Sequence, residues 1–188
     1  PLAVRGGGTR GLAARGAAVL ETSGLSGVRL YEPGALTLVA GAGTPVAEIE
    51  VALAAEGQRL AFEVPDLRQV LGRAGASTIG GVVAENASGP RRVQAGACRD
   101  FLLGVRFVDG RGDVLRNGGR VMKNVTGYDL VKLMAGSRGR LGVLTEVALK
   151  VLPNPEAEVT LALRGLGDAQ AVAALSAALG SPYEVSGA

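Results

Sequence analysis

Glycine constrains the fold of this chain more than any other residue, because it occupies 30 of 188 positions against about 7% in average proteins. No collagen-like glycine period is present, so these glycines are expected in tight turns and at close backbone approaches. Many gather in three segments, residues 5–11, 77–81 and 136–142. Such segments expose backbone N–H groups that suit anions. Together they indicate one large ligand that is contacted mainly by backbone.

The residue types that are absent narrow the chemistry. The chain has no His, which excludes a His-based catalytic triad, His-ligated zinc and a His-linked flavin. Its one cysteine, Cys98, excludes an internal disulfide and a CxxC site, and no metal site is expected. A single thiol fits a reducing compartment.

Composition excludes several classes of protein. Hydrophobic residues make up 47% and charged residues 20% of the chain, which excludes a disordered chain. No segment approaches the roughly 20 apolar residues of a membrane span. The net charge is only +3, aromatic residues make up 3%, and Lys and Arg are scattered. This pattern favours a small anionic ligand over nucleic acid.

The hydrophobic pattern predicts an α+β fold with many short strands and few helices, which do not alternate regularly as in a doubly wound sheet. Strands are expected at residues 2–4, 19–21, 28–31, 36–40, 101–108, 114–116, 143–152 and 159–163. Helices are expected at residues 44–57, 78–84, 127–135 and 168–179, and irregular chain at 65–78 and 89–97.

Several details of these helices are also predicted. Thr44 is expected to cap the first helix, with Pro45 at its first position, and Thr78 to cap the second. Leu130, Leu133 and Met134 are expected on one face of the third helix. Asp168 is expected to cap the last helix, whose inward side chains would be Val172, Leu175 and Leu179.

The first glycine segment is the best candidate for a phosphate site. Arg5 and Arg10 flank Gly6, Gly7, Gly8 and Thr9, and an Arg guanidinium can bind phosphate through two hydrogen bonds. The segment is not a Walker A motif, because no Lys-Ser/Thr follows. An ordinary glycine turn is the alternative. The segments at 77–81 and 136–142 have similar alternatives, a capped helix start and a bulged turn.

These motifs together resemble the FAD-binding domain of the vanillyl-alcohol oxidase (PCMH-type) flavoproteins. The resemblance rests on residues 5–9, 77–81 and 99–104, and on 123–130 with 136–146, which are typical of the branch that oxidises 2-hydroxy acids. Residues 88–92 and 118–124 are similar to the E-subunit family of bacterial glycolate oxidases. The resemblance covers residues 1–155 most strongly.

The resemblance implies FAD as the cofactor, and it assigns positions in this chain to it. The implied FAD-binding residues are Arg5, Gly6, Gly7, Gly8, Thr9, Arg10, Pro65, Asp66, Thr78, Gly80, Gly81, Asn86, Ala87, Ser88, Gly142 and Val143. The first segment would hold the diphosphate, and Gly142 and Val143 would meet the adenine side or the ribityl part. The flavin and its ribityl arm would be lined by Pro65, Asp66, Thr78, Gly80 and Gly81, with the wall continued by Asn86, Ala87 and Ser88. FAD is expected to bind non-covalently, because the chain lacks His and Cys98 lies outside the glycine segments.

The resemblance also implies a domain organisation. Residues 1–155 would form a two-subdomain PCMH-type domain with a boundary near 60–75, and 156–188 would begin a truncated C-terminal cap domain. The strand–helix unit that usually precedes the first glycine segment is expected to be truncated too. The family's usual Glu in the loop Gly-Ser-Glu-Gly is replaced by Arg138, so any role of that carboxylate is lost.

The implied function is an FAD-dependent oxidoreductase subunit that oxidises glycolate to glyoxylate. A second flavin subunit and an iron–sulfur subunit are the implied partners, in the cytoplasm or at the inner face of the membrane through those partners. No catalytic residue is identified, although Lys123, Tyr128 and Asp129 lie in or beside a family motif. The alternatives are an enzyme similar to D-lactate dehydrogenase, and an assembly subunit that keeps the fold without catalysis.

Overall fold

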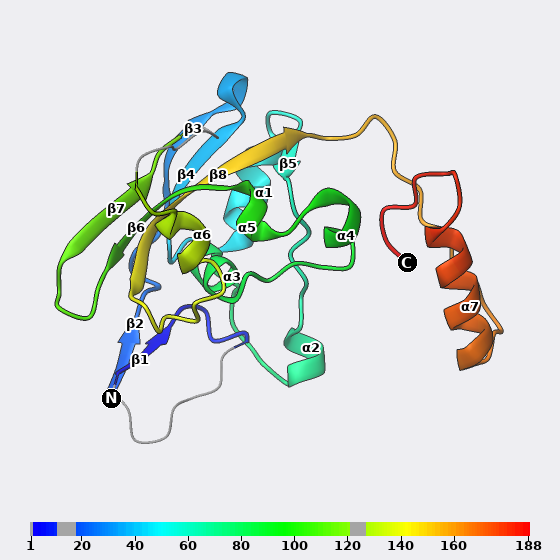
Figure 1. Ribbon diagram of the computed structural model, residues 1–188, viewed down its shortest axis with the longest axis horizontal. Helices are drawn as coiled ribbons and strands as arrows, with labels where there is room; N and C mark the ends of the chain where they lie inside the picture. The colour runs from blue at the N-terminus through cyan, green and yellow to red at the C-terminus, as the bar shows by residue number, and fades with distance from the viewer. Residues whose placement is uncertain (1, 11–17, 121–126) are drawn as a thin grey trace.

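The structure, a computed structural model, describes residues 2–10, 18–120 and 127–188. Within these residues the chain forms a mixed α+β fold with two sheets (Figure 1). The smaller sheet pairs β1 (Leu2–Arg5) with β2 (Ala18–Glu21) in parallel. It lies beside the larger sheet, which carries most of the buried side chains.

The larger sheet is antiparallel, and its main strand order is β3-β4-β8-β6-β7. Its strands are β3 (Val28–Glu32), β4 (Thr37–Gly41), β6 (Leu102–Val108), β7 (Val114–Gly118) and β8 (Val143–Pro153). A short strand, β5 (Gln58–Leu60), pairs with the end of β8. Val147, Leu149 and Val151 alternate along β8 and are fully buried, so the predicted period of two places one face of this strand in the core.

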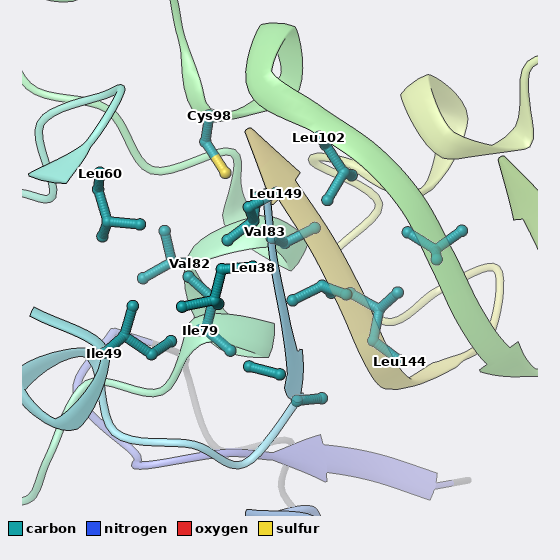
Figure 2. Packing of buried hydrophobic residues seen from close by; sticks show 14 of the residues in the cluster. Leu38, Ile49, Leu60, Ile79, Val82, Val83, Cys98, Leu102, Leu144 and Leu149 are labelled. Atoms are coloured by element: carbon teal, nitrogen blue, oxygen red, sulfur yellow. The ribbon is translucent and has the colours of Figure 1, made fainter. Parts of the chain in front are cut away.

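Helices cover the buried face of the larger sheet. They include α1 (Val46–Ala54), α3 (Ile79–Glu85), α5 (Cys98–Phe101) and α6 (Leu130–Met134). Figure 2 shows side chains of α3, such as Val82 and Val83, packed between Leu38 of β4 and Leu149 of β8. The core therefore fixes α3, whose start and end both reach the surface cavity described below.

The sequence predicted most elements correctly, with some corrections. Thr78 does cap α3, accepting a hydrogen bond from the Gly81 N–H. Thr44 does not cap α1: Pro45 holds the cap position, and the buried Thr44 hydroxyl donates to the Gly41 carbonyl instead, at 2.7 Å. This hydrogen bond stabilises the connection between β4 and α1, so the Thr44 hydroxyl is not available to cap the helix.

Short helices lie in segments that were expected to be irregular. They are α2 (Arg68–Leu71) and α4 (Arg92–Ala95), and a one-turn 3₁₀ helix, η1 (Pro33–Ala35), precedes β4. Residue 101 belongs to α5, so β6 begins one residue later than predicted. Elements of four residues carry too few periodic positions to be recognised from the sequence.

Other predictions about the helices and strands are wrong in part. On α6, Met134 is buried as expected, and so is Val131, whereas Leu133, predicted on the same face as Met134, is 56% exposed. Residues 159–163 form no strand, and Val159 and Leu161 are exposed. The last helix, α7 (Asp168–Leu179), starts after the cap residue Gly167 and buries no side chain, so Val172, Leu175 and Leu179 are exposed. Amphipathic patterns identify a face but not whether another element covers it.

The segment around residues 60–75 lies between strands that belong to the same sheet. Strand β4 pairs with β8, which follows residues 60–75, and β3 joins the same sheet through β4. The change from one sheet to the other lies between β2 and β3. Beyond β8 the chain leaves the sheet and leads to α7, which stands apart (Figure 1). Glu158 connects this segment to the rest of the domain. Its Oε2 lies 3.3 Å from Arg59 Nη1 and 3.5 Å from Arg91 Nη1.

Candidate functional site

The three glycine segments meet around one cavity of about 250 Å³. The first segment forms one wall, the start of α3 a second, and the loop before β8 a third. The sequence-predicted residues that line the cavity are Arg5, Gly6, Gly7, Gly8, Thr9, Arg10, Thr78, Gly80, Gly81 and Gly142. Gly11, at the end of the first segment, lies outside the described residues. The fold thus brings together segments that are more than 120 residues apart in the sequence.

The first segment packs backbone against backbone on the chain before α3. A Cβ atom at Gly6 would collide with the Thr78 hydroxyl, and one at Gly7 with the carbonyl of Ala76. A Cβ at Gly75 would in turn collide with the carbonyl of Gly7. These glycines are required by the contact between two loops, whether or not a ligand is present.

The backbone N–H groups of residues 6–10 are available to a ligand. None of them donates a hydrogen bond to another residue in the part of the chain that the structure describes. Backbone donors that face a cavity without protein acceptors need an acceptor from water or a ligand. Successive free N–H groups in a glycine turn form an anion-binding concavity. The first segment therefore has the donors that a phosphate group requires.

Arg10 adds a second kind of donor to this wall. Its Nη1 donates to the Ser77 hydroxyl at 2.7 Å, and its Nη2 donates to the Pro65 carbonyl at 2.5 Å. Its Nε is buried and has no hydrogen-bond partner among the described residues. Burial lowers the pKa of the Arg10 guanidinium, while Glu85 and Asp66 oppose this effect by their charge. A buried unpaired donor is costly, and an anionic ligand would satisfy it.

Arg5 is less available than Arg10. Its exposed guanidinium pairs with the Glu21 carboxylate across β1 and β2. The hydrogen bond between them raises the pKa of Arg5 and lowers that of Glu21. Since both side chains are exposed, solvent weakens this pair. Arg5 therefore lines the cavity with its charge already partly compensated.

The start of α3 differs from the expectation that it would offer free donors. Its first N–H groups already donate hydrogen bonds within the protein. Ile79 N–H donates to the Thr44 carbonyl at 2.9 Å, and Gly80 N–H donates to the Ala42 carbonyl at 2.8 Å. Gly81 N–H donates to the Thr78 side chain at 3.4 Å. A Cβ at Gly80 would also come within 2.6 Å of the Ala42 Cβ. These residues shape the wall, and the donors belong mainly to the first segment.

The loop before β8 is fastened to the end of α3. Gly136 N–H donates to the Val83 carbonyl at 3.0 Å, and Arg138 N–H to the Ala84 carbonyl at 2.9 Å. Arg138 adopts a left-handed conformation with φ of 56°, and its Nε lies 3.1 Å from the Glu85 carboxylate. Gly142 is needed for packing, since a Cβ there would come within 2.7 Å of the Val108 carbonyl.

The remaining predicted binding residues are not among those that line this cavity: Pro65, Asp66, Asn86, Ala87, Ser88 and Val143. Pro65 adjoins it through the hydrogen bond from Arg10. Asp66 is exposed, and hydrogen bonds from Arg68 lower its pKa to about 2. Their roles in binding stay predictions.

Four of these residues have structural partners. The Asn86 side chain accepts from the Arg99 N–H at 2.9 Å, the Ser88 hydroxyl accepts from the Cys98 N–H at 2.9 Å, and Ala87 packs on the core. Val143 begins β8 and pairs with Val108. Each of these residues therefore has a structural role that does not depend on a ligand.

Sequence reasoning missed several residues of the cavity. Val4, Val19 and Leu144 give it apolar lining, and Arg73 and Glu85 give it charge. Val4 and Leu144 could have been found, because each lies at a strand end beside a glycine segment. Arg73 and Glu85 carry no local signal, since only the packing of α3 and of the loop before it brings them to the cavity.

No cluster of three or more His, Cys, Asp or Glu side chains suited to a metal ion exists among the described residues. None of the helices in the described part of the chain has the length and apolar character needed to cross a bilayer.

The chain is similar in sequence to subunits and enzymes of known name. It is 49% identical to the glycolate oxidase subunit GlcE of Escherichia coli over 72% of this chain and 37% of that protein. It is 46% identical to the glycolate oxidase subunit GlcD of Bacillus subtilis, and 42% identical to a D-lactate dehydrogenase of Anaerostipes hadrus. Each of these two matches covers 45% of this chain and 18% of the relative. The chain thus spans well under half the length of these relatives.

The fold has a counterpart among solved structures. An alkyldihydroxyacetonephosphate synthase superposes with a TM-score of 0.63 over 83% of this chain and 28% of the other, at 23% identity. Residues 1–118, which include the first glycine segment and α3, match the family model described as an FAD binding domain. The resemblance inferred from the glycine motifs is therefore confirmed, and the chain belongs to this family of FAD-binding domains.

Proposed function

We propose that this chain is the FAD-binding part of a 2-hydroxy-acid oxidoreductase, and that it serves the oxidation of glycolate to glyoxylate. The observation that carries the proposal is the set of N–H groups at residues 6–10 and the buried Nε of Arg10, none of which has a hydrogen-bond partner among the described residues. This set of donors fits the diphosphate of FAD. The 49% identity to a glycolate oxidase subunit supports the choice of substrate.

The chain's own residues would bind and orient the cofactor. The first segment would hold the diphosphate, and the apolar side chains of Val4, Val19 and Leu144 would exclude water from part of the cavity. When bound, FAD supplies the hydride acceptor, which protein side chains cannot provide. The protein's contribution in this chain is thus recognition rather than proton transfer.

No general base is evident in the described part of the chain. Asp129 caps α6 by accepting from the Lys132 N–H at 3.0 Å, and Asp100 accepts from the Ala97 N–H at 2.8 Å. Tyr128 is 89% exposed and does not line the cavity. Lys123 lies outside the described residues. A base must reach the substrate hydroxyl within hydrogen-bond distance, so we propose that another subunit or segment supplies it.

We further propose how the chain is organised and where it acts. Residues 1–155 would form the FAD-binding domain, and 156–188 would begin a cap module, since α7 exposes its apolar side chains. The partners would be a second flavin subunit and an iron–sulfur subunit. The single cysteine supports a cytoplasmic location, with the partners providing any attachment to the inner face of the membrane.

FAD is expected to bind non-covalently. Cys98 is fully buried in the core, where Figure 2 shows its sulfur directed at neighbouring apolar side chains, and burial raises the pKa of its thiol to about 12. The thiol therefore stays protonated and unreactive near neutral pH. The protein, loaded with FAD and precipitated with acid, should release all of its yellow colour into the supernatant.

The same experiment tests the proposed function. A protein that takes up no flavin from an excess of FAD would contradict the proposed function. Flavin retained in the pellet would contradict only the prediction that FAD binds non-covalently. The native protein should also resist a thiol-alkylating reagent at pH 8 that labels Cys98 fully in denaturant.

Substrate oxidation is expected only from the assembled complex. This chain, loaded with FAD, should give no glycolate-dependent dye reduction above a no-enzyme control. Addition of the partner subunits should restore it. D-lactate is the matched second substrate, and a preference for it would favour the lactate dehydrogenase alternative. Turnover by the 188 residues alone would contradict the dependence on partners.

A further inference from the structure

Glu85 is the one acidic side chain among the described residues that line the cavity. It is the last residue of α3, and its side chain is 29% exposed. Arg138 Nε approaches one of its two oxygens, Oε2, at 3.1 Å. The other oxygen, Oε1, makes no hydrogen bond to a described residue. Among the described residues, the other charged side chains that line the cavity are arginines, and Oε1 of Glu85 is an acceptor that none of them uses.

A carboxylate at this place opposes the binding of an anion. Burial lowers the pKa of Arg10, and the charge of Glu85 opposes this effect, so its field reaches the guanidinium that carries the unpartnered donor. Compensation by Arg138 is weak, because 63% of the Arg138 side chain is exposed and exposed pairs contribute little. A carboxylate without a role in binding would therefore only weaken the affinity for a diphosphate.

An ionised carboxylate can contribute to binding only by accepting hydrogen bonds. FAD carries hydroxyl donors on both sides of its diphosphate, on the ribityl chain and on the ribose of adenosine. We propose that Glu85 accepts a hydrogen bond from a hydroxyl group of FAD and so offsets its repulsion of the diphosphate. This inference rests on the proposed function, because it assigns a residue to the same cofactor.

The local structure explains how Glu85 is held for this role. The core fixes α3, and the Arg138 N–H bond to the Ala84 carbonyl fastens the opposite loop to the end of this helix. Arg138 adopts a left-handed conformation there, and its Nε approaches Oε2, while Oε1 has no hydrogen-bond partner among the described residues. This contact favours one orientation of the Glu85 side chain, which reduces the entropy lost on binding.

The test is a titration of the full chain with FAD, with FMN and with ADP, followed by flavin fluorescence or calorimetry. Glu85→Ala is expected to weaken FAD binding on the order of 10-fold, since a hydrogen bond to a charged group contributes about 1.5–3 kcal/mol before the relief of repulsion. Glu85→Gln should weaken it by about threefold, because a neutral acceptor forms a weaker bond. Glu48→Gln, an exposed acid on α1, is the matched control and should change nothing.

The two smaller ligands identify the hydroxyl. A loss with ADP assigns Glu85 to the ribose, and a loss with FMN assigns it to the ribityl chain. The proposal is overturned if either variant, folded by its circular dichroism, binds FAD as tightly as the parent or more tightly. If Glu85→Ala fails to fold, the isosteric Glu85→Gln decides. Failure of the parent chain itself to bind FAD would instead contradict the proposed function.

Discussion

Gly7→Ala is expected to unfold the first glycine segment and to abolish FAD binding. The added Cβ would collide with the carbonyl of Ala76, and backbone on the opposite side cannot move as a flexible side chain could. Overpacking of this kind costs about 3 kcal/mol or more. The midpoint of thermal unfolding should fall clearly, and no saturable FAD binding should remain.

Gly8→Ala is the matched control for this substitution. Gly8 has a φ of 67°, but a Cβ there would meet only Arg5 Cδ, at 3.8 Å. The cost is then the left-handed conformation alone, about 1–2 kcal/mol. An unfolding midpoint of Gly7→Ala equal to or above that of Gly8→Ala would contradict the packing of the first segment on Ala76.

Arg10→Ala is expected to weaken FAD binding by roughly 10–150-fold, the equivalent of one charge-assisted hydrogen bond of about 1.5–3 kcal/mol. The substitution removes the unpartnered Nε donor and also the bonds to Ser77 and to the Pro65 carbonyl. The free energy of unfolding should therefore fall as well, by about 1–2 kcal/mol. Titration of FAD and denaturant unfolding measure the two effects separately.

Two comparisons sharpen this prediction. Arg10→Lys keeps the charge but cannot reach several acceptors with one planar group, so its FAD affinity should lie between those of the parent and Arg10→Ala. Arg5→Ala should have a smaller effect, because Glu21 already compensates that charge. Equal losses in Arg5→Ala and Arg10→Ala would show that only net charge matters. An unchanged affinity in Arg10→Ala would remove Arg10 from the site.

Some features of the fold and the site could be predicted from the sequence because they depend on local pattern. The alternation of apolar residues from Val143 to Val151 gave the central strand, and Thr78 before two glycines gave the start of α3. The glycine segments indicated where the backbone comes close to something else. The same segments carry the family resemblance, so the cofactor class could be predicted before the fold.

The tertiary structure alone decided what each of these features contacts. Gly7 opposes Ala76 rather than a ligand atom, the first amides of α3 are taken by the chain around Thr44, and the apolar face of α7 is left uncovered. Arg10 finds its partners 55 and 67 residues away.

The physical reason is that a sequence pattern reports the conformation and the apolar face of one segment, whereas contacts depend on how separate segments pack. Glu85 illustrates the difference. Its place at the end of a helix follows from local pattern, but its approach to the cavity and to Arg138 follows from the packing of α3 between the sheet and the loop before β8. The sequence by itself determined the cofactor class and most of the elements, and the packing of those elements determined which side chains reach the cavity.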